Sequence, residues 1–64
     1  MSPLKEFRLA RGLMQIEISK RIGISPQLLS KYEWGGIVPA PEIRRRLSIA
    51  LDVNPSVLFP GVED

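Results

Sequence analysis

Polar side chains that recur at helical spacing between residues 26 and 34 are the part of the sequence best suited to chemistry. At about 100° per residue, one face of this segment gathers amide, hydroxyl and ammonium groups without a carboxylate, from Pro26, Gln27, Ser30, Lys31 and Trp34. Leu28, Leu29 and Tyr32 cover the opposite side. Glutamine can bond N6 and N7 of adenine together, and lysine can bond the acceptors of guanine. The face therefore suits the reading of base edges, and an ordinary solvated helix surface is the alternative.

The chain lacks the residues on which most enzymatic and metal chemistry depends. Its 64 residues include no His and no Cys, which removes the commonest general base, a thiolate nucleophile and the usual transition-metal ligands. The carboxylates are scattered and form no catalytic constellation. We therefore expect no enzyme, no cofactor and no metal site, and the absence of Cys suits a reducing compartment.

The charge balance is mildly basic, as it is in many small domains. Nine Lys and Arg against seven Asp and Glu give a net charge of +2. Glu63 and Asp64 belong to a short acidic tail, residues 60–64, and without them nine basic side chains stand against five acidic ones, a net charge of +4. This balance favours a polyanionic partner such as nucleic acid.

The length fits a single small domain, which we expect to span residues 1–64. No apolar run approaches the roughly 20 residues of a membrane span, and the start of the chain does not resemble a signal peptide. We therefore expect a cytoplasmic protein without a membrane partner, associated with the nucleoid if it binds DNA.

Capping residues and glycines divide the chain into five expected helices. A Ser or Asn directly before a proline starts a helix, because its side-chain oxygen accepts a free N–H and proline lacks one; this pair occurs at Ser2, Ser25 and Asn54. Glycine ends helices in the left-handed conformation, and does so here at positions 12, 23 and 35. The expected helices are Pro3–Arg11, Gln15–Ile22, Pro26–Trp34, Pro41–Leu51 and Pro55–Leu58. No strand pattern is present, so we expect an all-α fold, a compact bundle of four to five helices.

Apolar residues at helical spacing supply the expected core. They are Leu4, Phe7, Leu9, Ala10, Ile18, Ile22, Leu29, Tyr32, Ile43, Leu47, Ala50 and Leu51, with Val53, Val57 and Leu58 closing the bottom. The second and third helices are joined by a short turn containing Gly23, which is the geometry of a helix-turn-helix. Small Ser19 suits the point where two helices cross, and Ile24 can plug the turn into the core.

Several short motifs follow one another in a fixed order along most of the chain. They are Arg11-Gly12-Leu13, Gln15, Glu17, Ile18-Ser19, Gly23-Ile24-Ser25, Ser30-Lys31-Tyr32-Glu33 and Ala50-Leu51-Asp52-Val53. In this order, from Leu4 to Phe59, they resemble the lambda-repressor/Cro-like helix-turn-helix family, also called the XRE family. The resemblance implies a helix-turn-helix over about residues 15–34. It also implies a sequence-specific regulator of transcription that binds double-stranded DNA with its third helix in the major groove.

The resemblance further implies a DNA-binding site. Its expected members are Gln15, Ser25, Pro26, Gln27, Ser30, Lys31 and Trp34. Gln15 is expected to bond a phosphate and brace the recognition helix, and Ser25 to cap that helix first and contact DNA second. Gln27 is the strongest candidate for a base contact, Pro26 offers only apolar contact, and Lys31 reads a base or touches only phosphate.

Trp34 has three readings: an indole N–H donated to a phosphate, a contact between subunits, or partial cover for the core. Lys20 and Arg21 are expected to make weaker contacts that do not depend on sequence. Arg8 and Glu33 match a pair that forms a buried or half-buried salt bridge in the family. Two departures from the family pattern are Met14, a poor cap for the second helix, and Asp52, which replaces a common glycine in a turn.

Three consecutive arginines, Arg44 to Arg46, suggest a basic patch only in the linear sequence. On a helix their side chains fan out by about 100° each. A solvated face is therefore the favoured reading, with Arg44 or Arg46 as peripheral phosphate contacts otherwise.

The core stripes do not need four further apolar residues, which are Ile37, Val38, Ile49 and Phe59. The resemblance implies pairing through the loop after the recognition helix and through the fourth and fifth helices, and together with these residues it predicts a homodimer on an imperfect palindrome.

The expected function is a repressor of phage-repressor, Cro-like or antitoxin-like type that occludes promoter elements, controlled by its own abundance or by a protein antagonist. The main alternative is a protein-interaction module, such as an antitoxin or cofactor, that keeps the helix-turn-helix fold but acts through a protein partner. An enzyme is the distant third reading.

Overall fold

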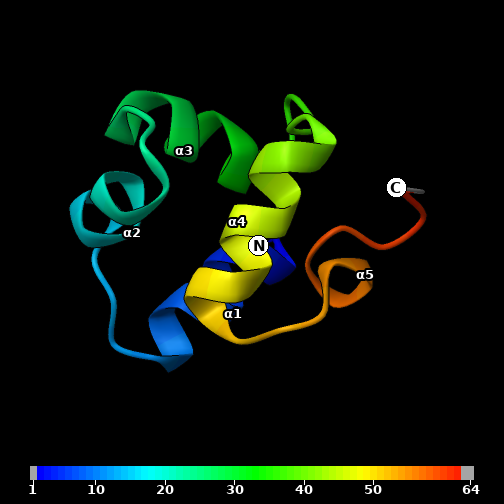
Figure 1. Ribbon diagram of the computed structural model, residues 1–64, viewed down its shortest axis with the longest axis horizontal. Coiled ribbons are helices and arrows are strands. Elements are labelled where there is room, and N and C mark those ends of the chain that lie inside the picture. Colours follow the sequence, from blue (N-terminus) through cyan, green and yellow to red (C-terminus); the bar gives the residue numbers. More distant parts are fainter. Residues whose placement is uncertain (1, 63–64) are drawn as a thin grey trace.

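The structure is a computed structural model that describes residues 2–62 (Figure 1). Over these residues the regular secondary structure is entirely helical. The helices are α1 (Pro3–Ala10), α2 (Gln15–Ile22), α3 (Pro26–Trp34), α4 (Pro41–Leu51) and α5 (Pro55–Leu58). The predicted all-α class is confirmed. The predicted bounds are also confirmed, except that α1 ends one residue early and Arg11 is its C-terminal cap. Glu63 and Asp64 of the expected acidic tail lie outside the described residues.

The predicted caps start three of the helices. The side-chain oxygens of Ser2, Ser25 and Asn54 accept backbone N–H groups at 3.1–3.3 Å. The start of α2 has no such cap because Met14 offers no oxygen, and there the Glu17 carboxylate accepts the Met14 N–H at 3.0 Å. A carboxylate in the first turn also interacts favourably with the helix dipole, so α2 recovers part of what the missing cap would have supplied.

Residues in the left-handed backbone conformation end three helices, which are α2 and α3 on either side of the turn, and α4. Gly23 ends α2 with φ 77° and Gly35 ends α3 with φ 82°. Asp52 takes the same conformation at the end of α4, with φ 55° and ψ 48°. Aspartate tolerates this region better than most side chains, which explains how the chain keeps the turn without the glycine common in the family.

The core lies where α2 and α4 cross and where α1 packs against α3 and α5. Its buried apolar residues are Leu4, Ile18, Ile22, Leu29, Tyr32, Leu47, Leu51 and Leu58. Ser19 is 1% exposed, as expected for a small residue between crossing helices, and Ile24 packs the turn against the core. These contacts fix the angle between α2 and α3, which determines what α3 presents to solvent.

The expected burial of four apolar residues is wrong. Leu9 is 50% exposed and Ala10 is also exposed, because α1 packs only one side against α3 and α5. Val57 is 43% exposed, since α5 is a single turn that directs Leu58 inward and leaves its neighbour outside. Phe59, expected to be free for a subunit contact, instead packs against the core.

Candidate nucleic-acid interface

The polar face predicted for α3 lies on the surface of the protein. Gln27 and Lys31 are exposed, and Pro26 and Ser30 are half-buried beside them. The opposite side is anchored in the core, with Leu29 fully buried and Tyr32 9% exposed. Among the hydrogen bonds and ion pairs of residues 2–62, none uses the side chain of Gln27 or Lys31. Their polar ends are therefore available to a partner outside the chain.

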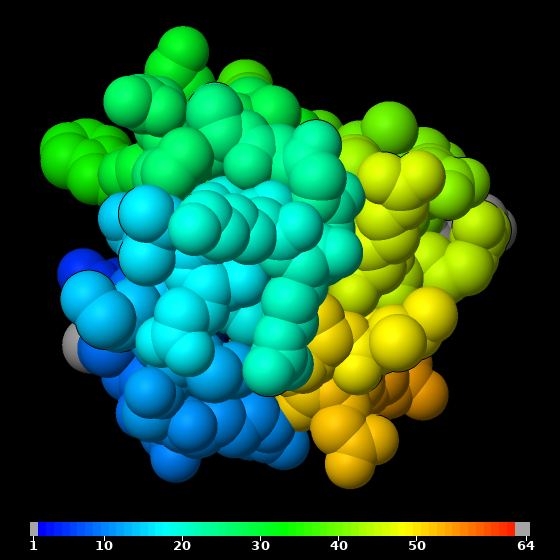
Figure 2. Space-filling view, turned by 60° about the vertical axis from the view of Figure 1, so that its left-hand side comes forward, coloured from blue at the N-terminus to red at the C-terminus, as the bar shows by residue number. Residues whose placement is uncertain are grey.

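The turn before α3 fixes where this face begins. Ser25 accepts the Leu28 N–H at 3.1 Å, and Pro26 follows in the first turn. The Ser25 side chain is therefore committed to the cap, in keeping with its expected first role. Figure 2 shows α2 (cyan) at the front of the molecule and α3 (green) rising above it, so that the start of α3 stands at one edge of the surface.

A buried ion pair holds α3 against α1 and α2. Arg8 donates from Nε to Glu33 Oε2 at 2.5 Å and from Nη2 to Oε1 at 3.2 Å. Arg8 also donates to the Leu13 carbonyl at 2.7 Å, so one guanidinium ties three segments together. Both side chains are less than a tenth exposed. The predicted pair is confirmed, and it is a structural brace rather than part of the exposed surface.

Gln15 joins this brace from the start of α2. Its Nε2 donates to Glu33 Oε1 at 2.9 Å, so the expected brace on α3 is present. A primary amide has two N–H donors and an acceptor oxygen, and the half-buried side chain keeps one of each for another partner. The contact to a phosphate remains a prediction.

The arginines of α4 do not form a basic patch, and the reading of Arg44 as solvated or as a phosphate contact is wrong. Arg44 is 6% exposed, and its Nη1 donates to the Pro39 carbonyl at 2.6 Å. A helix that packs on α2 and α5 buries more of its circumference than the apolar stripe alone predicts. Arg44 is drawn into that contact and anchors the loop after α3.

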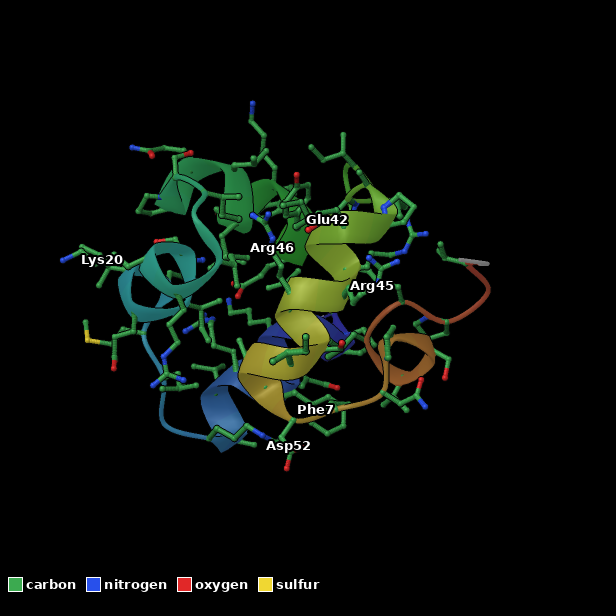
Figure 3. All side chains as sticks on the ribbon, viewed as in Figure 1. Phe7, Lys20, Glu42, Arg45, Arg46 and Asp52 are labelled. Carbon is green, nitrogen blue, oxygen red and sulfur yellow. The ribbon has the colours of Figure 1, made fainter. Side chains whose placement is uncertain are left out.

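Arg45 and Arg46 remain on the surface, as the solvated reading expects. Both guanidinium groups lie near the carboxylate of Glu42, one turn earlier on the helix (Figure 3). Arg45 Nη1 is 3.7 Å from Glu42 Oε2, and Arg46 Nη2 is 3.2 Å from Glu42 Oε1. Arg46 also donates to the Ile22 carbonyl at 3.1 Å, near the end of α2. The Arg46 guanidinium is therefore already paired with groups of the protein itself. Lys20, in contrast, extends away from the body of the protein at the edge of Figure 3, where its expected contact with a phosphate remains a prediction.

Trp34 stands out from the surface between two hollows. It is 87% exposed, so the reading of Trp34 as cover for the core is wrong. The polar hollow, of about 610 Å³, is lined by Ser2, Lys5, Gln15, Ser30, Glu33 and Trp34. The apolar hollow, of about 340 Å³, is lined by Ser30, Lys31, Trp34, Gly36 and Ile37.

The structure places one further residue, Lys5, beside members of the predicted site. It lies on α1, outside the helix-turn-helix, and lines the polar hollow beside Gln15. A signal for it existed in the sequence, because Arg8 was expected to reach α3. A residue three positions earlier on the same helix shares that side.

Three of the apolar residues set aside for a subunit contact are exposed. Ile37 and Val38, in the loop after α3, are 45% and 58% exposed, and Ile49 on α4 is 75% exposed. Ile37 also lines the apolar hollow next to Trp34. Ile37 therefore continues the surface that begins with Trp34, and Val38 follows it in the chain, while Ile49 lies beside Arg21 and Arg46.

The described residues contain neither a metal-binding cluster nor a membrane-spanning helix. No cluster of three acidic, His or Cys side chains there could hold a metal ion, and no helix of residues 2–62 has the length and apolar character needed to cross a membrane.

In the comparisons with known proteins, a family model described as helix-turn-helix matches residues 4–58. No curated protein and no solved structure matches the chain.

Proposed function

The chain belongs to the lambda-repressor/Cro-like helix-turn-helix family of DNA-binding regulators, and from this premise we propose that it recognises a specific duplex sequence with α3 in the major groove. The observation that carries the proposal is the outer face of α3. It is exposed and free of carboxylates, and its amide and ammonium ends are unused within the described chain.

Base reading is assigned to Gln27 and Lys31. Glutamine is suited to adenine and lysine to guanine, and both project from the same side of a helix whose other side is buried. Pro26 adds apolar contact at the start of the helix, suited to a thymine methyl group. Ser30 lies between them and tolerates either kind of base.

Phosphate contacts position the reading helix. Gln15 has a free amide hydrogen next to α3, and Trp34 has an exposed indole N–H at the other end of the same face. Lys20 and Arg21 add positive charge on α2. Contacts of this kind fix orientation without carrying sequence information. Binding should therefore weaken with salt, with a slope of about −0.9 per phosphate neutralised.

We assign a second copy of the chain to the exposed apolar residues of the loop after α3, Ile37 and Val38. A two-fold pair would present two recognition helices about 34 Å apart, on successive major-groove faces. Repression then follows from occlusion of promoter elements, and a protein antagonist that covers the α3 face would relieve it. This assignment also accounts for apolar surface that a small domain otherwise leaves in water.

Selection from random duplexes tests the proposal. The expected result is one recurring half-site, present twice in inverted orientation with centres about 10 base pairs apart. Recovery of no preferred sequence would overturn sequence-specific recognition. Size-exclusion chromatography with light scattering, with and without the selected duplex, tests the dimer, and a monomer in both cases would end that part of the proposal.

A further inference from the structure

The polar hollow draws its lining from three helices that are distant in sequence. Ser2 and Lys5 come from the start of α1, Gln15 from the start of α2, and Ser30 and Trp34 from α3. In Figure 2 the green end of α3 overhangs the dark blue start of α1 at the left-hand edge of the molecule. The hollow is therefore continuous with the α3 face and opens beside it.

The one carboxylate in the lining does not make the hollow acidic. Glu33 is 5% exposed, and each of its oxygens already accepts at least one hydrogen bond, from Arg8 or Gln15. The charges of Glu33 and Arg8 cancel locally because they form an ion pair. Among the lining residues that the structure describes, Lys5 is then the only one with an uncompensated charge, and it is exposed.

The other polar groups of the lining can all donate hydrogen bonds. Gln15 keeps one amide hydrogen, Ser30 carries a hydroxyl, and Trp34 carries an indole N–H that can only donate. One positive charge with several neutral donors, beside the outer face of α3, which carries no free carboxylate, matches a singly charged oxyanion better than a base or a neutral ligand. A phosphodiester is the oxyanion that a duplex supplies at such a position.

We propose that the polar hollow holds one phosphodiester of the bound duplex and that Lys5 is the residue that supplies its charge. The inference rests on the proposed function and extends the DNA contact beyond the helix-turn-helix to α1. The phosphate would sit between α1 and the end of α3, where it fixes how far α3 enters the groove. Lys5 acts as a positioning contact and carries no sequence preference.

The test compares Lys5→Ala with Arg45→Ala on the selected duplex. Each variant removes one positive charge from an exposed side chain, but Arg45 lies on α4, where its neighbour is Glu42. Lys5→Ala is expected to weaken binding roughly tenfold at low salt and to reduce the salt slope by about 0.9. Arg45→Ala is expected to change neither, and Lys5→Arg is expected to restore most of the affinity. Equal effects of the two alanine variants would overturn the inference.

Neutral methylphosphonate linkages, introduced one at a time into the duplex, locate the contact. For the unaltered protein, a neutral linkage at one position of each half-site is expected to reduce the affinity about as much as Lys5→Ala does. At that linkage, Lys5→Ala is expected to lose nothing more, because the two changes remove the same interaction. A further loss of the same size at every linkage would contradict the inference. The thermal midpoint of Lys5→Ala should match the unaltered protein, which separates a contact from a folding defect.

Inorganic phosphate distinguishes the backbone of DNA from a free anion as the source of the ligand. Trp34 is the only tryptophan of the chain and lines the hollow, so its fluorescence reports occupancy. The selected duplex should change the emission at concentrations near its dissociation constant, and millimolar phosphate should not. Saturation by phosphate alone, lost in Lys5→Ala, would reassign the hollow to a free anion and overturn the inference. If no duplex binds at all, the proposed function fails together with it, whereas specific binding that is indifferent to Lys5 overturns only the inference.

Discussion

The outer face of α3 and the arginine run of α4 are both polar helix surfaces, yet their side chains differ in how far they are engaged within the protein. The run of α4 has the higher charge density, but Arg44 is buried on the Pro39 carbonyl and Arg46 is engaged by Glu42 and the Ile22 carbonyl. On α3 a single lysine and a glutamine have no side-chain partner within the described chain. The two surfaces therefore differ most in whether their polar groups are available to a partner outside the chain.

The same contrast explains why the two surfaces should respond differently to substitution. Removing a group that is bonded inside the protein leaves a buried partner unsatisfied, which lowers the free energy of unfolding. Removing an available group changes the folded state little and is felt only when the partner arrives. Four substitutions, taken from the largest expected effect to the smallest, test this distinction.

Arg8→Ala should have the largest effect, because it leaves the Glu33 carboxylate buried with only Gln15 as a side-chain partner. The expected cost is about 3–5 kcal/mol of unfolding free energy, a large share of the stability of a domain this small. Urea denaturation followed by circular dichroism measures it, and Arg8→Lys, which keeps the charge, should lose less. A cost below about 1 kcal/mol would contradict the description of this pair as a buried brace.

Arg44→Ala should cost about 1–3 kcal/mol of unfolding free energy, because it removes the donor from a buried carbonyl in the loop after α3. The affinity for DNA, measured under conditions where the variant remains folded, should change little. A loss of affinity with unchanged stability would instead make Arg44 a phosphate contact and would weaken the distinction between the two helices.

Gln27→Ala should leave the free energy of unfolding within about 0.5 kcal/mol, since the side chain is exposed. We expect it to lose about 1–3 kcal/mol of discrimination at one base pair of each half-site. Competition with duplexes altered at single positions measures this loss. If the preferred sequence is the same with and without Gln27, the assignment of that residue is wrong.

Arg45→Ala should have the smallest effect on both properties. Its pair with Glu42 is long, at 3.7 Å, and both side chains are about two-thirds exposed, so we expect a change in unfolding free energy below about 0.5 kcal/mol. DNA affinity should also be unchanged. The neighbouring variants Arg44→Ala and Arg45→Ala thus form a matched pair on one helix, and similar losses in stability would refute the contrast drawn between them.

Local chemistry explains how much of the fold the sequence predicts. The caps Ser2, Ser25 and Asn54 and the left-handed Gly23 and Gly35 depend only on near neighbours in the chain, so they locate the helices almost to the residue. The division of α3 into an exposed polar face and a buried apolar face follows from the helical spacing of its residues.

The errors arise where burial depends on which helix packs where. Periodicity shows which residues of one helix share a face, but it does not show how wide the buried face is. Arg44 and Leu9 were misjudged for this reason. Lys5 was missed in the candidate site because the candidate residues were taken from the helix-turn-helix motif, which does not include α1.

Replacement of purine N7 by carbon in the selected duplex tests most directly whether α3 reads the major groove. This change removes a major-groove acceptor and leaves the minor groove unaltered. The account predicts that 7-deaza substitution at one purine of each half-site weakens binding by about 1–3 kcal/mol, and that Gln27→Ala or Lys31→Ala removes this sensitivity. Binding that ignores every 7-deaza substitution but falls when inosine removes the minor-groove amino group of guanine would contradict it.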